Sequence, residues 1–254
     1  MANASTDNPT AAVLVIGDEI LSGRTADTNL NTVARFLTEL GVDLLEARVV
    51  GDRREQIVDA INTLRSGHDY LFTTGGIGPT HDDITAECVA AAFGVALPFH
   101  PEALAILERR YGADFNDARR RMARIPEGGT LIRNPVTDAP GFQVENVFVM
   151  AGVPKIMQVM LEDVRPRLRT GAAVVSRTLK VEGVGEGVLS APLEAVATAY
   201  PELSLGSYPF GSGSNDFGAQ LVVRGRDADR VRAAIKDLTA ALKDAGVERI
   251  TPLD

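Results

Sequence analysis

The stretch YLFTTGGIGPTHDDIT, residues 70–85, joins the end of an apolar strand to a glycine loop and the start of a helix. An apolar run from Tyr70 to Thr74 precedes three glycines, and Asp82 and Asp83 follow them. A glycine loop that opens a helix is typical of an anion-binding site, because backbone N–H groups and the positive helix end point at the ligand. Two carboxylates at that helix end would repel a phosphate. Either the loop binds no phosphate, or a positive group lies between the phosphate and the aspartates.

Strand and helix patterns alternate on both sides of this stretch. Their order predicts an α/β fold with a mainly parallel sheet and helices on both faces. A hairpin turning at Glu145–Asn146 and a final helix are expected to complete this part. The expected strands are residues 11–17, 42–51, 70–76 and the two arms of 142–152, and the expected helices are residues 28–40, 54–67, one ending near 93, one beginning at 101, and 153–168.

The pattern changes after RTGAA, residues 169–173, to strand, helix, strand, strand, helix. We therefore expect a domain boundary near Gly171 and a small α+β domain over residues 171–254. The first domain is expected over residues 11–170, preceded by a flexible tail at residues 1–10.

Composition limits the classes of partner. The 254 residues carry 26 Lys and Arg against 34 Asp and Glu, so the net charge of −8 favours neither nucleic acid nor an acidic membrane. The start of the chain does not look like a secretion signal, and no apolar run approaches the length of a membrane span. A single cysteine, Cys88, suits a reducing compartment, and its helical context predicts a buried thiol. We expect a cytoplasmic protein with no membrane or nucleic-acid partner.

A second acidic segment is expected at the same edge of the sheet. The first strand ends in GDEILSGRTADTN, so Asp18 and Glu19 should leave the sheet beside the loop that carries Asp82 and Asp83. Four carboxylates in one cleft would repel each other unless they were protonated, paired with basic groups or bound to a hard cation. Mg²⁺ takes one or two carboxylates and completes its shell with water and phosphate oxygens. A divalent ion on Asp82 and Asp83 would thus make the phosphate and the aspartates compatible.

Each of these features also has a simpler interpretation. Thr80 and Asp83 have the spacing of a capping box, and Asp27 precedes the next helix like a cap. His81 is expected to be an exposed loop residue. An arginine-rich segment would usually form a solvated helix face, although one or two of its side chains could reach a phosphate; its members are Arg109, Arg110, Arg119, Arg120, Arg121 and Arg124.

Four motifs resemble the CinA family (competence/damage-inducible protein CinA) in order and spacing. They are GDEILSGRTADTN, TTGGIGPTHDDIT, NPVTDAPGF and AGVPKIM. The resemblance implies a three-layer α/β/α molybdopterin-binding domain followed by a small KH-like domain. For the family it also implies metal-dependent hydrolysis of a nucleotide pyrophosphate such as ADP-ribose, to AMP and ribose 5-phosphate. A homo-oligomer is expected, with a dimer favoured over a trimer, and K⁺ is a further candidate cofactor beside the divalent ion.

The resemblance also assigns roles residue by residue. Asp83 matches an essential aspartate and Asp82 its neighbour, so both are candidate catalytic residues and metal ligands. Asp18 and Glu19 match the acidic motif after the first strand and are further catalytic candidates. The expected substrate and phosphate contacts are Gly75, Gly76, Gly78, Thr80, Asn29, Pro140 and Gly141.

Two departures from the family limit the transfer. Many relatives read PGVPxEM where this chain has Ala151 and Ile156, so one carboxylate is missing from that end of the pocket. Full-length relatives continue into an amidase domain, and we expect no amidase activity from these residues. Two other functions stay open: adenylyl transfer to a pterin phosphate in molybdenum cofactor biosynthesis, and binding of a pterin or nucleotide without catalysis.

Overall fold

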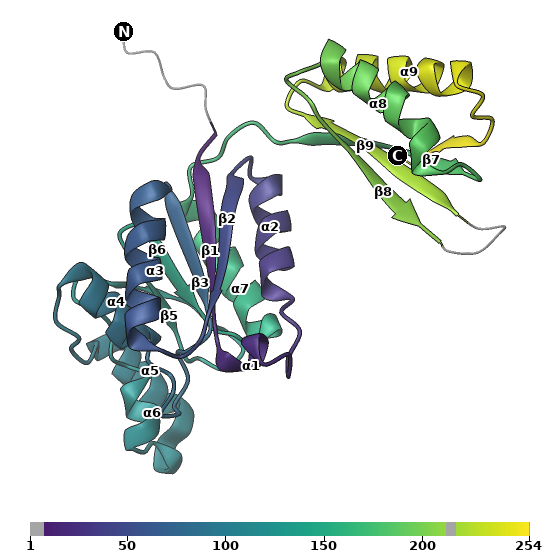
Figure 1. Cartoon of the computed structure of the whole chain (residues 1–254). Helices are drawn as coiled ribbons and strands as arrows, with labels where there is room; N and C mark the ends of the chain where they lie inside the picture. The colour runs from purple at the N-terminus through teal and green to yellow at the C-terminus, as the bar shows by residue number, and fades with distance from the viewer. Residues whose placement is uncertain (1–7, 212–216, 254) are drawn as a thin grey trace, which may run out of the picture. The chain divides into compact units, whose positions relative to one another are not determined.

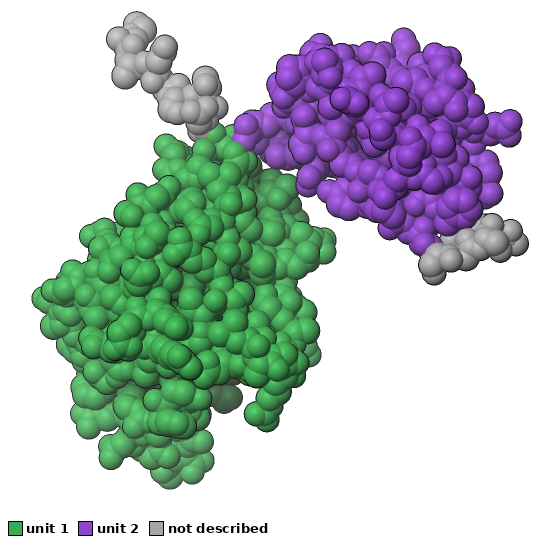
Figure 2. All heavy atoms as spheres, in the orientation of Figure 1, with its two compact units in different colours: residues 1–171 green, residues 172–254 purple. Residues whose placement is uncertain are grey.

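The structure, a computed structural model, describes residues 8–211 and 217–253. The chain divides after Gly171 into two compact units, which Figure 2 colours separately. Unit 1 holds the glycine loop, and unit 2 holds the C-terminal α+β region. Each unit has its own hydrophobic core and is described by itself.

Unit 1 contains a six-stranded sheet in the order β2-β1-β3-β6-β5-β4 (Figure 1). Strands β2, β1, β3 and β6 run parallel, whereas β5 and β4 are antiparallel to their neighbours. The expected mainly parallel sheet is therefore confirmed. The strands are β1 Thr10–Ile16, β2 Asp43–Val50, β3 Tyr70–Thr74, β4 Thr130–Ile132, β5 Gly141–Val144 and β6 Val147–Met150.

Helices cover both faces of this sheet, which confirms the three-layer arrangement. Apolar side chains of α2 and α7 pack on one face, and those of α3, α4 and α5 pack on the other. The central strand β1 serves both cores, because its alternate residues point to opposite faces. The helices are α1 Asp18–Leu21, α2 Asn29–Glu39, α3 Arg54–Gly67, α4 Thr85–Phe93, α5 Pro101–Tyr111, α6 Asp117–Arg121 and α7 Pro154–Val164.

The expected hairpin at Glu145–Asn146 joins β5 to β6. Glu145 adopts a positive φ of 48°, as tight hairpin turns require. The edge strand β4 was not expected from the sequence. It has only three residues and is defined by its pairing with β5 rather than by an apolar pattern of its own.

The flexible tail expected over residues 1–10 is wrong for its last three residues. Residues 1–7 lie outside the described part, but Asn8 and Pro9 are buried and Thr10 begins β1. The Pro9 carbonyl accepts a hydrogen bond from the Asp43 N–H at 2.8 Å. These residues belong to the fold because they extend the contact between the starts of β1 and β2.

The last residue of unit 1 is held at the same end of the sheet. The Gly171 N–H donates to the Leu40 carbonyl at 3.0 Å. A Cβ on Gly171 would lie 2.3 Å from Asn8 Oδ1 and 2.5 Å from the Gly41 carbonyl oxygen. Glycine is therefore required where the chain leaves unit 1.

Unit 2 contains a four-stranded antiparallel sheet in the order β10-β7-β9-β8. Its chain order, β-α-β-β-α-β, is that of the ferredoxin-like motif. Helices α8 and α9 bury Leu189, Val196 and Leu238 against it. The strand β10 was not expected and, like β4, has three residues. The elements are β7 Val175–Glu182, α8 Glu186–Ala199, β8 Ser204–Phe210, β9 Gly218–Gly225, α9 Ala228–Asp244 and β10 Ile250–Pro252.

Within the described residues, no helix combines the length and the apolar character needed to cross a membrane.

Cys88 belongs to α4 and packs into the hydrophobic core of unit 1 with 0% exposure, which confirms the expected buried thiol. Burial raises the pKa of this thiol to about 11. Because the thiolate is the nucleophile, we expect almost no alkylation by iodoacetamide at neutral pH while the protein is folded. Mass spectrometry should detect complete labelling only after unfolding in guanidinium chloride. Rapid labelling of the folded protein would contradict this assignment.

Candidate functional site

The glycine loop follows β3 and depends on two glycines with positive φ. Gly75 has φ 103° and Gly76 has φ 67°. A Cβ on Gly75 would lie 2.1 Å from the Ile16 carbonyl oxygen, and one on Gly76 would lie 2.2 Å from Thr85 Oγ1. A residue with a side chain would clash at either position, so the loop can follow this path only with glycine.

The loop is tied to the first turn of α4. The Thr85 N–H donates to the Gly76 carbonyl at 3.0 Å, and the Thr85 hydroxyl donates to the Gly75 carbonyl at 3.0 Å. Thr85 is fully buried, so these bonds are protected from water. The nine-residue helix α4 therefore begins directly beside the loop, as an anion site requires.

Asp83 does not cap this helix. Helix α4 begins at Thr85, and Asp83 lies two residues before it. The carboxylate instead closes a turn, because its Oδ2 accepts bonds from the Thr80 N–H at 2.8 Å and from the Thr80 hydroxyl. The alternative of a helix-capping box at Thr80 is therefore wrong, whereas the Asp27 carboxylate does accept an N–H of the first turn of α2, that of Leu30 at 2.9 Å.

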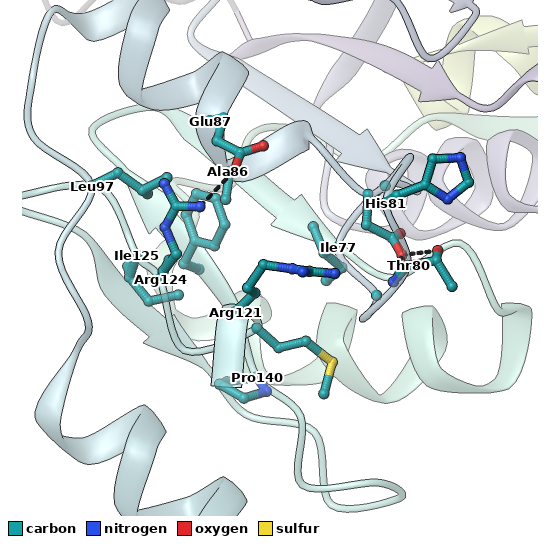
Figure 3. Close-up of a pocket in the computed structure, with 15 residues that line it drawn as sticks. Ile77, Thr80, His81, Ala86, Glu87, Leu97, Arg121, Arg124, Ile125 and Pro140 are labelled. Atoms are coloured by element: carbon teal, nitrogen blue, oxygen red, sulfur yellow. Dashed lines mark hydrogen bonds and ion pairs between the residues drawn. The ribbon is translucent and has the colours of Figure 1, made fainter. Parts of the chain in front are cut away.

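A pocket of about 250 Å³ opens against this loop (Figure 3). The loop contributes Gly76, Gly78 and Thr80, and Asp83 forms part of the same wall. Ala86 and Glu87 of α4, the segment 121–125, and Pro140 with Phe142 complete it. We call this space the loop pocket.

Two arginines bring positive charge to the loop pocket. Arg121 points toward the Thr80 turn in Figure 3 and donates to the Pro79 carbonyl at 2.9 Å. Arg124 pairs with Glu87 at 2.6 Å. Arg119 and Arg120 lie instead over the rings of Tyr111 and Phe99. Of the arginine-rich segment, Arg121 is thus the member that lines the pocket without an ion pair among the described residues.

A separate acidic group lies at the ends of β1 and β2. Asp18 and Glu19 begin α1, and the Asp18 N–H donates to Asp52 Oδ2 at 2.9 Å. Burial raises the pKa of Asp52, and the charges of Asp18, Glu19 and Asp82 raise it further, against the lowering effect of this hydrogen bond. Asp52 was missed in the sequence. Its position directly after β2, at the same sheet edge as Asp18, was the signal that could have identified it.

The four expected carboxylates do not all line the loop pocket. Asp83 does, whereas Asp82 is exposed and acts on Asp52 together with Asp18 and Glu19. In the part of the chain that the structure describes, no three acidic, histidine or cysteine side chains are placed to hold a metal together.

Asp83 still fits a divalent ion that takes its other ligands from phosphate and water. Both bonds from Thr80 end on Oδ2, so Oδ1 has no hydrogen-bond partner among the described residues. An ionised carboxylate oxygen is the ligand type that Mg²⁺ prefers. The exposed Asp82, the next residue, is available as a second ligand.

The remaining predicted contacts fall into two groups. Pro140 lines the loop pocket. Asn29 and Gly141 lie outside its lining: Asn29 donates to the Gly152 carbonyl at 2.7 Å, and a Cβ on Gly141 would lie 2.3 Å from the Val149 carbonyl oxygen. Gly141 thus allows close approach of two strands, and Asn29 fixes the start of the α7 segment. His81 is exposed, as expected.

A glycine loop at the carboxyl edge of a mainly parallel sheet, opening into a helix, is the ligand-binding arrangement of many α/β proteins. Residues 12–170 match the family described as "Probable molybdopterin binding domain". The chain belongs to this family, and the proteins similar to it include CinA-like proteins.

Three relatives illustrate the relationship. A CinA-like protein of Citrifermentans bemidjiense is 41% identical over 201 residues, which cover 75% of this chain and 48% of that protein. A protein of Aeropyrum pernix is 34% identical over 259 residues, which cover 98% of this chain and 92% of that protein. The crystal structure of the protein CinA, of unknown function, from Thermoplasma acidophilum matches with a TM-score of 0.61 at 36% identity, covering 64% of this chain and 99% of that one. The chain thus spans about half the length of the CinA-like relative.

The second unit has its own match. Residues 173–250 match the family described as "FAD synthase, middle domain". This is the region for which the sequence had suggested a KH-like domain.

Proposed function

We propose that unit 1 hydrolyses the pyrophosphate of a nucleotide such as ADP-ribose, in a metal-dependent reaction that releases AMP and ribose 5-phosphate. The supporting observation is the loop pocket, whose lining brings together the glycine loop, Asp83 and Arg121. Its volume of about 250 Å³ is just below the range of about 300–1,000 Å³ found for drug-sized ligands. The pocket therefore suits the phosphate part of a dinucleotide and leaves the rest outside.

The protein's own groups would stabilise negative charge as it develops on the phosphates. The N–H groups of Gly76 and Gly78 lie in a loop at the start of α4, where the positive helix end adds to them. Arg121 supplies a guanidinium that matches phosphate oxygens geometrically. Thr80 holds Asp83 in place through two hydrogen bonds, so the carboxylate need not reorganise.

In this proposal a divalent ion, Mg²⁺ or a similar metal, is held by Asp83 with Asp82. It would withdraw charge from the bridging phosphates and so lower the barrier to attack by water. The catalytic roles of Asp18 and Glu19 stay predictions, as do a contribution from K⁺ and a homo-oligomeric state. Arg121 lines the same pocket, so a basic side chain is already present to offset the repulsion between Asp83 and a phosphate.

Adenylyl transfer to a pterin phosphate is a second candidate, and the match of residues 12–170 to a molybdopterin-binding family supports it. The two reactions share phosphate binding at the loop and differ in the group that attacks phosphorus. Hydrolysis gives AMP and a sugar phosphate, whereas transfer joins AMP to the pterin.

The products identify the reaction. We expect the full chain with Mg²⁺ to convert ADP-ribose to AMP and ribose 5-phosphate, measured by chromatography. An adenylylated product from ATP and a pterin phosphate would support transfer instead, and binding without turnover would support a binding module.

Calorimetry tests the metal in the same sample. If the ion and the phosphate bind as partners, excess EDTA should weaken ADP-ribose binding about fivefold or more, the lower end of typical coupling between linked sites. Equal affinity for ADP-ribose with and without EDTA would contradict the metal-binding part of the proposal. Arg121 would then be the group that offsets the repulsion between Asp83 and the phosphates.

A further inference from the structure

A second pocket, of about 850 Å³, lies beside the short edge strand β4. Helix α5 forms one wall, and the segment 133–138 forms another. Asp163 of α7, with Pro166 and Arg167 just beyond that helix, closes it. We call this space the β4 pocket. It shares Pro140 with the loop pocket and otherwise has different lining residues.

The back wall of the β4 pocket is held by Arg167. Its guanidinium donates to the Leu131 carbonyl at 2.9 Å, to Gln143 Oε1 at 3.2 Å and to the Asp163 carboxylate. Asp163 also accepts the Arg133 N–H at 3.2 Å. Arg167 and Asp163 therefore satisfy each other and the neighbouring backbone, and neither contributes an uncompensated charge.

A buried asparagine fixes the segment 133–138. Asn134 is 5% exposed, and its Oδ1 accepts the N–H groups of Val136 at 3.1 Å and Thr137 at 3.3 Å. Its Nδ2 donates to the Ala139 carbonyl at 2.9 Å and to the Thr137 hydroxyl. With both ends of its amide in use, Asn134 shapes this wall into a rigid turn rather than a flexible loop.

Two positive charges on the lining have no partner. Among the described residues, the side chains of Arg109 and Arg133 make no ion pair and no hydrogen bond, and both are exposed. The carboxylate of Asp138 lies 3.7 Å from Arg110. Glu102 is then the one carboxylate on the described lining that no arginine compensates. The lining thus carries three arginines and three carboxylates, and Arg109 and Arg133 are the two cationic groups that the described residues leave unpaired.

We propose that the β4 pocket binds a small anion through a phosphate or carboxylate group held by Arg109 and Arg133. A planar guanidinium binds either group with two parallel hydrogen bonds. The same lining contains Ile106, Leu131 and Pro135, which can cover an apolar part of the same ligand. The β4 pocket is distinct from the site of the proposed reaction, because none of these five residues lines the loop pocket.

The test uses the full chain and two simple probes, inorganic phosphate and succinate. Each is titrated at constant ionic strength, because exposed charges are screened by salt. Backbone amide shifts are followed by NMR for Arg133, Asn134 and Val136 in the β4 pocket, and for Gly76 and Gly78 in the loop pocket. The two sites are thus observed separately, and failure of one leaves the other measurable.

We expect saturable shifts at the β4-pocket amides with phosphate, succinate or both, which also identifies the preferred anion. The double substitution Arg109→Gln and Arg133→Gln should weaken this binding about tenfold or more, since charge-assisted bonds to both arginines are lost. Arg35→Gln removes an exposed arginine of α2 that lines neither pocket, and should leave binding unchanged.

Two results would overturn the proposal. One is the absence of saturable shifts at the β4-pocket amides with either probe. The other is equal binding by the double variant and the unmodified protein. Shifts confined to Gly76 and Gly78 would support the loop pocket alone and reject the second site.

Discussion

Asp83→Asn is expected to abolish turnover of ADP-ribose while the fold stays intact. The asparagine oxygen can still accept the bonds that Thr80 donates to Asp83, so the turn should survive with a change in unfolding free energy of less than about 1 kcal/mol. The substitution removes the negative charge that the proposed metal requires. A rate loss without a stability loss separates a chemical role from a structural one.

Asp117→Asn is a matched control for this substitution. It removes an exposed carboxylate at the start of α6, outside the lining of the loop pocket, and should leave the rate unchanged. Steady-state rates and urea unfolding curves are measured for both variants. Full activity of Asp83→Asn would exclude a metal-binding role for this residue.

Gly75→Ala is expected to destabilise unit 1 strongly. The added Cβ would lie 2.1 Å from the Ile16 carbonyl oxygen, which belongs to the backbone of β1 and cannot rotate away. Gly75 also has φ 103°, a conformation that alanine rarely adopts. Strain of this kind and displacement of a central strand together predict a loss of about 3 kcal/mol or more in unfolding free energy.

Gly67→Ala provides the comparison. Gly67 ends α3, and no heavy atom lies within 4 Å of the Cβ that the substitution would add. The change should therefore be neutral or stabilising, within about 1 kcal/mol. Urea denaturation followed by circular dichroism measures both variants. Similar unfolding midpoints for the two would show that the contact at Gly75 can relax.

The layers of unit 1 could be predicted because buried parallel strands are continuously apolar and their helices are amphipathic. β1 illustrates this: both its faces are covered, so its sequence has no polar positions after Thr10. The strands β4 and β10 could not be predicted in the same way. Three residues carry no period, and these strands exist because a neighbouring strand offers hydrogen-bond partners.

The sequence could locate the loop pocket but not the arrangement of its side chains. The strand ends indicated the sheet edge at which the loop lies, and the glycines indicated the loop itself. The direction of each side chain depended on tertiary bonds: Thr80 turns Asp83 into the pocket, and the Asp18 N–H draws in Asp52. Four arginines of one segment show the same limit, because their contacts differ. Arg119 and Arg120 lie over the rings of Tyr111 and Phe99, Arg121 donates to the Pro79 carbonyl, and Arg124 pairs with Glu87.

The anchoring of Gly171 has a consequence for how such chains can be recombined. Its contacts, Asn8 and the Leu40–Gly41 turn, lie where β1 and β2 begin, whereas the glycine loop lies where the parallel strands finish. The polypeptide therefore leaves unit 1 at the end of the sheet where the parallel strands begin, which is the end opposite to the glycine loop. Any module joined after this glycine can be exchanged, lengthened or lost in evolution without rerouting a strand that carries the loop. A CinA-like relative of which the match covers 48% is compatible with such an arrangement.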